Sequence, residues 1–198
     1  FGVMFAGVLG LSGASAEPVV LPLLATQILW INLVTDSTPA LAMGVDPEID
    51  DVMARPPRRV DERVLDRGMW ATILSIGLVT AIVTLATIDL FLPGGLIPGG
   101  NETLVVARTG GFTTLVFAVL LTTLTSRSAT TSAFRGLFQN RWLWGALGLS
   151  ALLQVAVVEL PFLQLAFGTA SLAPWQWAAC LAMASAVFWF DELRKLIL

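Results

Sequence analysis

Long apolar runs alternate with short polar connectors along the whole chain. Five runs are long enough to cross all or most of the hydrocarbon layer of a bilayer, because a helix rises about 1.5 Å per residue; they lie near residues 23–44, 69–92, 110–126, 142–160 and 175–190. The opening run, FGVMFAGVLGL, is too short for a complete span. The pattern predicts an all-α integral membrane protein, a polytopic bundle of about five full spans and a partial one.

The connectors divide the chain into segments. Residues 1–12 lack the initiator methionine, basic region and cleavage site of a signal peptide, and we interpret them as the distal half of a helix that starts before this sequence. On this interpretation, residues 13–22 form an outer loop and residues 23–198 form a C-terminal transmembrane domain. The longest polar connectors lie near 45–68 and 127–141.

The basic residues predict which side of the membrane each connector occupies. Ten of the eleven lysines and arginines lie in the connectors near 45–68 and 127–141 or in the C-terminal tail. By the positive-inside rule these segments are cytoplasmic, which predicts a multi-pass protein of the cell membrane. The exception is Arg108, near the outer end of a span, where its side chain can extend to the interface.

Composition excludes several classes of function. More than half of the residues are hydrophobic, and histidine and tyrosine are absent, so the lipid bilayer is the expected surrounding and nucleic acid is not an expected partner. The single cysteine, Cys180, lies in an apolar run and is expected to pack there. One cysteine cannot form a disulfide framework or a thiolate metal site.

Polar residues interrupt the run at 23–44. Asn32, Thr35 and Asp36 are spaced i, i+3 and i+4, so their side chains project from one helical face. Asp36 lies near mid-depth, where an aspartate costs roughly 2.5–3.5 kcal/mol on insertion scales and needs a partner or a water-filled cavity. Pro39 has no N–H and its ring clashes with the carbonyl of residue i−4, which predicts a loosened helix at residues 35–39.

Asn32, Thr35 and Asp36 therefore form a candidate metal site. Amide, hydroxyl and carboxylate oxygens are hard donors that suit Ca²⁺, Mg²⁺, Na⁺ or K⁺ and do not suit copper or zinc. The alternative is structural: Asn32 and Thr35 bond a neighbouring helix, Pro39 is an ordinary kink, and Asp36 is a protonated packing residue. We favour a cation site because a carboxylate, an amide and a broken helix coincide at mid-depth.

Three stretches resemble the calcium-pump branch of the P-type cation-transporting ATPases. QILWINLVTDSTPALAMGVDPEIDDVMARPPR, residues 27–58, resembles the sixth transmembrane helix and the following loop, with its N-x-x-T-D cluster, Pro39 and the ending M-x-R-P-P-R. ARTGGFTTLVFA at 107–118 and SRSATTSAFRGLFQNRWL at 126–143 look like the eighth helix and the next loop, and DELRKLIL resembles the end of the tenth. The resemblance implies a chain that runs from the distal fifth helix through the tenth.

The resemblance also implies a function. The chain would be the membrane portion of an ATP-driven cation pump, and we favour Ca²⁺ export across the plasma membrane. The enzyme's ATP and Mg²⁺ would act in phosphorylation, nucleotide and actuator domains that precede Phe1, so no catalytic residue is expected in this chain. A proline-glutamate motif on the fourth helix and a carboxylate on the fifth would complete the ion site that Asn32, Thr35 and Asp36 begin.

The eighth-helix segment departs from the two-site calcium pumps. Val119 stands where those relatives carry glutamate or glutamine, and an apolar side chain cannot coordinate a cation. This predicts one ion per cycle. The threonines of the segment are expected to form interhelical hydrogen bonds; they are Thr113, Thr114, Thr122 and Thr123.

Other interpretations stay open. A self-contained channel or ion-coupled carrier would use Asp36 to bind a proton or Na⁺ without ATP, a pump of the Na⁺/K⁺ type would carry alkali cations, and a membrane scaffold would transport nothing. Interfacial solvation is the expected explanation for the remaining acids, of which Asp89 and Glu159 lie near the outer face and Asp191 and Glu192 lie at the inner end of the last helix.

Overall fold

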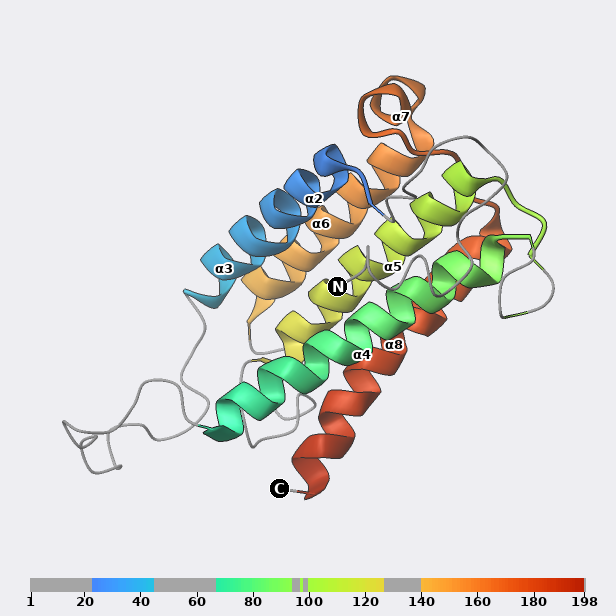
Figure 1. Ribbon diagram of the computed structural model, residues 1–198. Coiled ribbons are helices and arrows are strands. Elements are labelled where there is room, and N and C mark those ends of the chain that lie inside the picture. Colours follow the sequence, from blue (N-terminus) through green and yellow to red (C-terminus); the bar gives the residue numbers. More distant parts are fainter. Residues whose placement is uncertain (1–22, 45–66, 94–96, 98–99, 127–139, 198) are drawn as a thin grey trace, which may run out of the picture.

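A computed structural model describes residues 23–44, 67–93, 97, 100–126 and 140–197 of the chain (Figure 1). Within these residues the secondary structure is helical and no strand is present, so the predicted all-α fold is confirmed. The elements are α2 (Ala25–Ile31), η1 (Asn32–Ser37), α3 (Thr38–Met43), α4 (Arg67–Phe91), α5 (Leu104–Thr125), α6 (Arg141–Glu159), α7 (Pro161–Phe167) and α8 (Pro174–Ile197). The predicted half-helix 1–12, the outer loop 13–22 and nearly all of the connectors at 45–68 and 127–141 lie outside the described residues.

The helices follow the apolar runs of the sequence. Three of them are long and apolar enough to cross a membrane: Gly68–Phe91, Leu104–Thr125 and Arg141–Glu159. The chain is therefore a multi-pass membrane protein. Two ends differ from expectation: α5 starts at Leu104 rather than at 110, with a hydrogen bond from the Val106 N–H to the Thr103 hydroxyl at its N-terminus (3.4 Å), and α8 continues to Ile197.

The connector after α6 contains a short helix that was not expected. Proline 161 supplies its first residue, where a missing N–H costs nothing because that group has no partner within the helix. Gly168 ends it with φ 61°, a left-handed conformation that glycine adopts without strain. Both signals stand in the sequence, but the 7-residue helix is shorter than the apolar runs that indicate spans.

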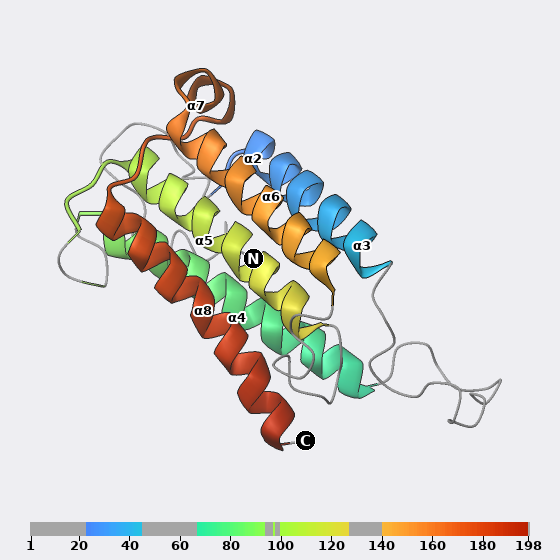
Figure 2. The ribbon, with the colours of Figure 1, turned by 180° about the vertical axis from the view of Figure 1, so that it is seen from behind.

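The helices form two unequal groups. Helices α4, α5 and α8 pack against one another along most of their lengths, and the continuous rod α2–η1–α3 lies beside α6 (Figures 1 and 2). Helix α5 lies between the two groups and supplies Phe112, Val116 and Leu120 to an apolar cluster that also contains Ile31 of α2 and Val157 of α6. The candidate cation cluster is thus carried by the helix at one side of the bundle.

Two glycines allow α4 and α5 to approach closely. A methyl group at Gly110 would overlap the Phe91 ring, and a methyl group at Gly111 would overlap the Ile88 side chain. Both partners are buried, with Phe91 0% and Ile88 2% exposed. Small residues at helix contacts are the usual means of close packing in membranes, where apolar side chains gain little from leaving lipid.

Replacing Gly110 by alanine is expected to destabilise the protein. The added methyl group must displace the buried Phe91 ring, and overpacking of this kind costs roughly 1–3 kcal/mol. A matched control is Gly77→Ala on α4, where an added methyl group meets nothing within 4 Å and the better helix propensity of alanine is expected to be neutral or stabilising. Thermal unfolding of the purified protein in detergent measures the difference, and equal midpoints for the two variants would contradict the close contact.

Candidate cation site

The polar cluster lies on a distorted part of its helix. Between α2 and α3, residues Asn32–Ser37 form one turn of π-helix, a wider turn in which the N–H of residue i+5 bonds the carbonyl of residue i. Such turns are uncommon and occur frequently at functional sites. The distortion begins three residues before the predicted stretch 35–39, because a wide turn placed ahead of Pro39 moves the preceding carbonyls away from the proline ring.

The three candidate ligands have different surroundings. Thr35 is buried, at 4% exposed, and its hydroxyl donates a hydrogen bond to the Ile31 carbonyl (2.7 Å). A hydroxyl that donates its proton keeps oxygen lone pairs for a cation. Asn32 is exposed in the described part of the molecule, and the side chain of Asp36 lies outside it. The convergence of the three side chains on one ion stays a prediction.

Polar side chains of α6 hold this distorted helix. The Ser150 hydroxyl donates to the Val34 carbonyl (3.1 Å). The Gln154 amide accepts from the Trp30 indole N–H (3.2 Å) and donates to the Thr113 hydroxyl (3.3 Å). Ser150, Gln154 and Thr113 are all 0% exposed, so these bonds form away from solvent and join α2, η1, α5 and α6.

Each end of the same helix has a further polar attachment. At the start of α2, the Gln27 amide donates to the Phe167 carbonyl of α7 (3.2 Å). At the end of α3, the Asn140 amide donates to the Ala42 carbonyl (2.8 Å), while its oxygen accepts from the Leu143 N–H at the start of α6 (3.1 Å). The whole rod α2–η1–α3 is therefore fastened to the α6–α7 segment by side chains that bond backbone carbonyls.

The threonines of α5 behave in different ways. Thr113 forms the expected interhelical bond, with Gln154. For Thr122 and Thr123 the expectation is wrong, because their hydroxyls donate to the Ala118 and Val119 carbonyls of their own helix. The Thr114 hydroxyl is buried without a hydrogen-bond partner among the described residues.

Carboxylate, histidine and thiol side chains do not cluster in the part of the chain that the structure describes. Across residues 23–44, 67–93, 97, 100–126 and 140–197, no group of three or more histidine, cysteine, aspartate or glutamate side chains gathers in one place. Cys180 packs as expected: it is 0% exposed, and its thiol donates to the Gly110 carbonyl (3.5 Å).

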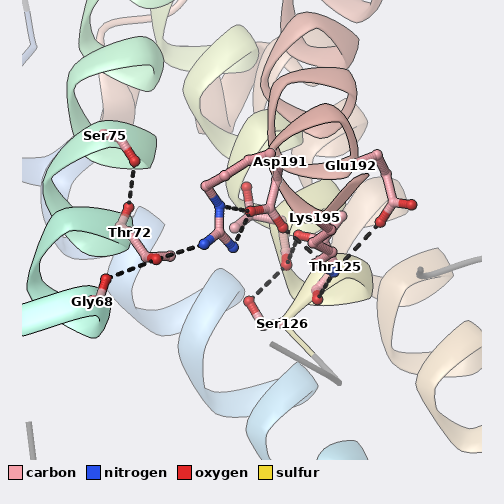
Figure 3. A network of polar contacts seen from close by, with 10 residues as sticks. Gly68, Thr72, Ser75, Thr125, Ser126, Asp191, Glu192 and Lys195 are labelled. Carbon is pink, nitrogen blue, oxygen red and sulfur yellow. Dashed lines mark hydrogen bonds and ion pairs between the residues drawn. The ribbon is translucent and has the colours of Figure 1, made fainter. Parts of the chain in front are cut away.

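Buried charges gather at the C-terminal end of α8. Asp191 is 2% exposed and Glu192 6% exposed, so the expectation that interfacial solvation explains them is wrong. Arg194 pairs with Asp191 (2.7 Å) and donates to the Thr72 hydroxyl of α4 (2.6 Å). Lys195 approaches Asp191 (3.5 Å) and Glu192 (3.4 Å) and donates to a carbonyl of α5 (2.6 Å), as Figure 3 shows. We call these four α8 residues the charge cluster.

The environment of Asp191 favours its ionised form. This residue follows the last apolar run and lies at the end of α8. Burial raises the pKa of Asp191, but hydrogen bonds and the positive charges of Arg194 and Lys195 outweigh burial and hold this pKa below its usual value. Figure 3 shows that the charge cluster contacts α4 and α5, so it ties three helices together at one end of the bundle.

Comparison with known proteins identifies the family of the chain. Residues 20–197 match the family described as "Cation transporting ATPase, C-terminus". The chain belongs to this family. It is 37% identical over 165 residues to a calcium-transporting ATPase of Bacillus subtilis, covering 83% of this chain and 18% of that protein. It is 38% identical over 177 residues to the calcium-transporting ATPase type 2C member 2 of Mus musculus, covering 88% of this chain and 18% of that protein.

A third relative extends the match to fungi. The calcium-transporting ATPase 1 of Yarrowia lipolytica is 34% identical over 178 residues, which cover 89% of this chain and 18% of that protein. The chain thus spans about a fifth of the length of these relatives. The resemblance to the C-terminal region of calcium-pump-like ATPases, noted from sequence motifs, is confirmed.

Within this cation-transporting ATPase region, sequence reasoning missed the polar residues of α6. Ser150 and Gln154 are spaced i and i+4 in an otherwise apolar run, which places them on one helical face. That spacing was the available signal. Their partners, Val34 and Trp30, lie more than a hundred positions earlier in the chain, so only the packing of the helices identifies them.

Proposed function

We propose that this chain is the membrane portion of an ATP-driven cation pump and that Asn32, Thr35 and Asp36 supply part of its intramembrane ion site. The observation that carries the proposal is the π turn at Asn32–Ser37, which coincides with the three oxygen-bearing residues. Transporters commonly bind cations where a membrane helix departs from regular geometry near the midplane. Membership of the cation-transporting ATPase family supplies the reaction class.

Calcium is the cation that we propose. The relatives from Bacillus subtilis, Yarrowia lipolytica and Mus musculus are named calcium-transporting ATPases. Ca²⁺ takes about 6–8 oxygen ligands, so the amide, hydroxyl and carboxylate of this chain would be joined by ligands from preceding helices. ATP and Mg²⁺ would act in cytoplasmic domains of the same protein, and phosphorylation there would expose the ion site to each side of the membrane in turn.

The proposed orientation follows from charge. The cytoplasm would contain the arginine-rich connectors near 45–68 and 127–141 and the C-terminal tail. The pump would export the cation across the cell membrane. Helix α5 carries no aspartate or glutamate, and Val119 occupies the position where the two-site pumps have a ligand. We therefore propose that a single ion is carried in each cycle.

Transport by the full-length protein tests the proposal. In inside-out membrane vesicles, ATP is expected to drive uptake of radioactive Ca²⁺, with one Ca²⁺ bound per phosphoenzyme. Excess Mn²⁺, Na⁺ or K⁺ in parallel reactions identifies the preferred cation. Uptake driven by a proton or Na⁺ gradient without ATP would instead indicate a carrier, and two bound Ca²⁺ per phosphoenzyme would contradict the single-ion proposal alone.

A further inference from the structure

The hydroxyl of Ser150 on α6 reaches the one turn of the neighbouring helix that departs from α geometry. We propose that Ser150 is a positioning residue for the cation site, which holds the Val34 carbonyl and thereby fixes the orientation of Thr35. The residue is not itself a cation ligand in this proposal. The inference rests on the proposed function, since it assumes that Thr35 contributes to cation binding.

The Val34 carbonyl lies in the π turn, where Pro39 alters the backbone hydrogen bonding. In a π-helix this carbonyl would accept from the N–H of the fifth residue onward. That residue is Pro39, which has no N–H. The Ser150 hydroxyl donates to the Val34 carbonyl from the neighbouring helix at 3.1 Å. A side chain of α6 therefore bonds the backbone of the cation-bearing helix at the turn that Pro39 disrupts.

The hydrogen bond from Ser150 to the Val34 carbonyl also affects the orientation of Thr35. The peptide unit that contains the Val34 carbonyl also contains the N and Cα atoms of Thr35, and this unit is planar. Holding the carbonyl oxygen therefore restricts the direction in which the Thr35 side chain leaves the backbone. Val34 is 2% exposed and Ser150 is 0% exposed, so the hydrogen bond is shielded from competing water and is stronger than an exposed one.

The position of Ser150 is itself determined by a neighbouring residue on α6. Gln154 lies one turn further along the same face and bonds both the Trp30 indole of α2 and the Thr113 hydroxyl of α5. These two bonds set the position of α6 along α2. Ser150 is thereby kept opposite Val34 rather than opposite another carbonyl of the same helix.

Asn140 provides a control, because it also bonds the cation-bearing helix but at a carbonyl outside the π turn. Comparing the two residues shows whether Ser150 positions Thr35 or only attaches the helix. The Asn140 amide donates from the α6 region to a carbonyl of the cation-bearing helix, at 2.8 Å. The acceptor is Ala42, which lies beyond the π turn and is not followed by a candidate ligand. If α6 only anchors the helix, loss of either bond should have the same consequence. If Ser150 positions Thr35, only its loss should weaken cation binding.

The test compares Ser150→Ala with Asn140→Ser in the full-length protein. Serine at position 140 keeps a side-chain acceptor for the start of α6 but is too short to reach Ala42. The readouts are the Ca²⁺ concentration for half-maximal phosphorylation by ATP and the phosphorylation level from inorganic phosphate without Ca²⁺. Ser150→Ala is expected to raise that Ca²⁺ concentration about fivefold, equivalent to about 1 kcal/mol, with phosphorylation from phosphate unchanged.

Asn140→Ser is expected to change the Ca²⁺ concentration for half-maximal phosphorylation less than about twofold, because the Ala42 carbonyl lies beyond the π turn and its loss of a bond affects stability rather than ligand geometry. Ser150→Cys, similar in size and a weaker donor, is expected to give a smaller rise than alanine and serves as the test if the alanine variant does not accumulate. An unchanged Ca²⁺ concentration in the Ser150 variants, or an equal rise for Asn140→Ser, would overturn the positioning role.

The failure of this inference can be told from failure of the proposed function. If the unmodified protein shows no Ca²⁺-dependent phosphorylation from ATP, the proposed function fails and with it the assumption on which the inference rests. If the unmodified protein responds to Ca²⁺ and the Ser150 variants respond at the same concentration, only the positioning role fails.

Discussion

Replacing Asp36 by asparagine is expected to abolish Ca²⁺-dependent phosphorylation of the full-length protein by ATP. Asparagine keeps the shape of the side chain and removes its charge. An ionised aspartate at mid-depth costs roughly 2.5–3.5 kcal/mol on insertion scales, and in the proposed site the bound cation offsets that cost. Loss of this attraction should therefore raise the Ca²⁺ concentration for half-maximal phosphorylation at least about a hundredfold, since each tenfold change in affinity corresponds to about 1.4 kcal/mol.

Phosphorylation from inorganic phosphate provides the control for folding in the Asp36→Asn variant, because that reaction needs no bound Ca²⁺ in the proposed cycle. Ser37→Ala is the matched substitution: Ser37 ends the same π turn and is exposed in the described part of the molecule. It is expected to respond to Ca²⁺ like the unmodified protein. Normal Ca²⁺-dependent phosphorylation of the Asp36→Asn variant would remove the basis of the site assignment.

The second large effect is a loss of stability, which we expect when Asp191 of the charge cluster is replaced by asparagine. Asp191 is the shared partner of Arg194, at 2.7 Å, and Lys195, at 3.5 Å, and the Lys195 side chain is 3% exposed. Removing one member of a buried ion pair leaves an uncompensated charge and costs roughly 3–5 kcal/mol. Thermal inactivation of the purified protein in detergent should shift to clearly lower temperature.

Glu159→Gln is the matched control for this loss of stability. Glu159 is an exposed carboxylate whose oxygen accepts from the Trp177 indole at 3.1 Å, a bond that the glutamine oxygen can also accept. Its replacement should change stability by less than about 0.5 kcal/mol. Equal inactivation temperatures for the Asp191 and Glu159 variants would show that the buried pairs contribute little to holding α4, α5 and α8 together.

Much of this fold could be predicted from the sequence, because a membrane helix must satisfy its backbone internally and must be apolar over a fixed length. The runs that became α4, α5 and α6 follow directly from that constraint. The disturbance near Asn32 was also predictable, because Pro39 breaks the hydrogen bonding of any helix. Its position was not, since the backbone geometry there is supported by Ser150, which is 116 positions away.

The burial of Asp191 could not be predicted either, because it also depends on residues far away in the sequence. Carboxylates next to basic residues at the end of an apolar run usually indicate an interface with water. Here Arg194 and Lys195, which pair with these carboxylates, also bond Thr72 on α4 and the Thr125 carbonyl of α5, and both acceptors lie in distant parts of the chain. Local sequence shows that charges can pair along α8, but only tertiary packing decides whether solvent reaches them.

The unequal attachment of the helices has a mechanical consequence. Glycine contacts and the charge cluster fasten α4, α5 and α8 to one another, whereas α2–η1–α3 is joined mainly to α6, through hydrogen bonds to backbone carbonyls. Apolar contacts add to these bonds, because Ala42 of α3 lies in one cluster with Leu143 and Ala146 of α6. The packing thus divides these helices into two units, and we expect any relative movement to carry the rod and α6 together against α4, α5 and α8.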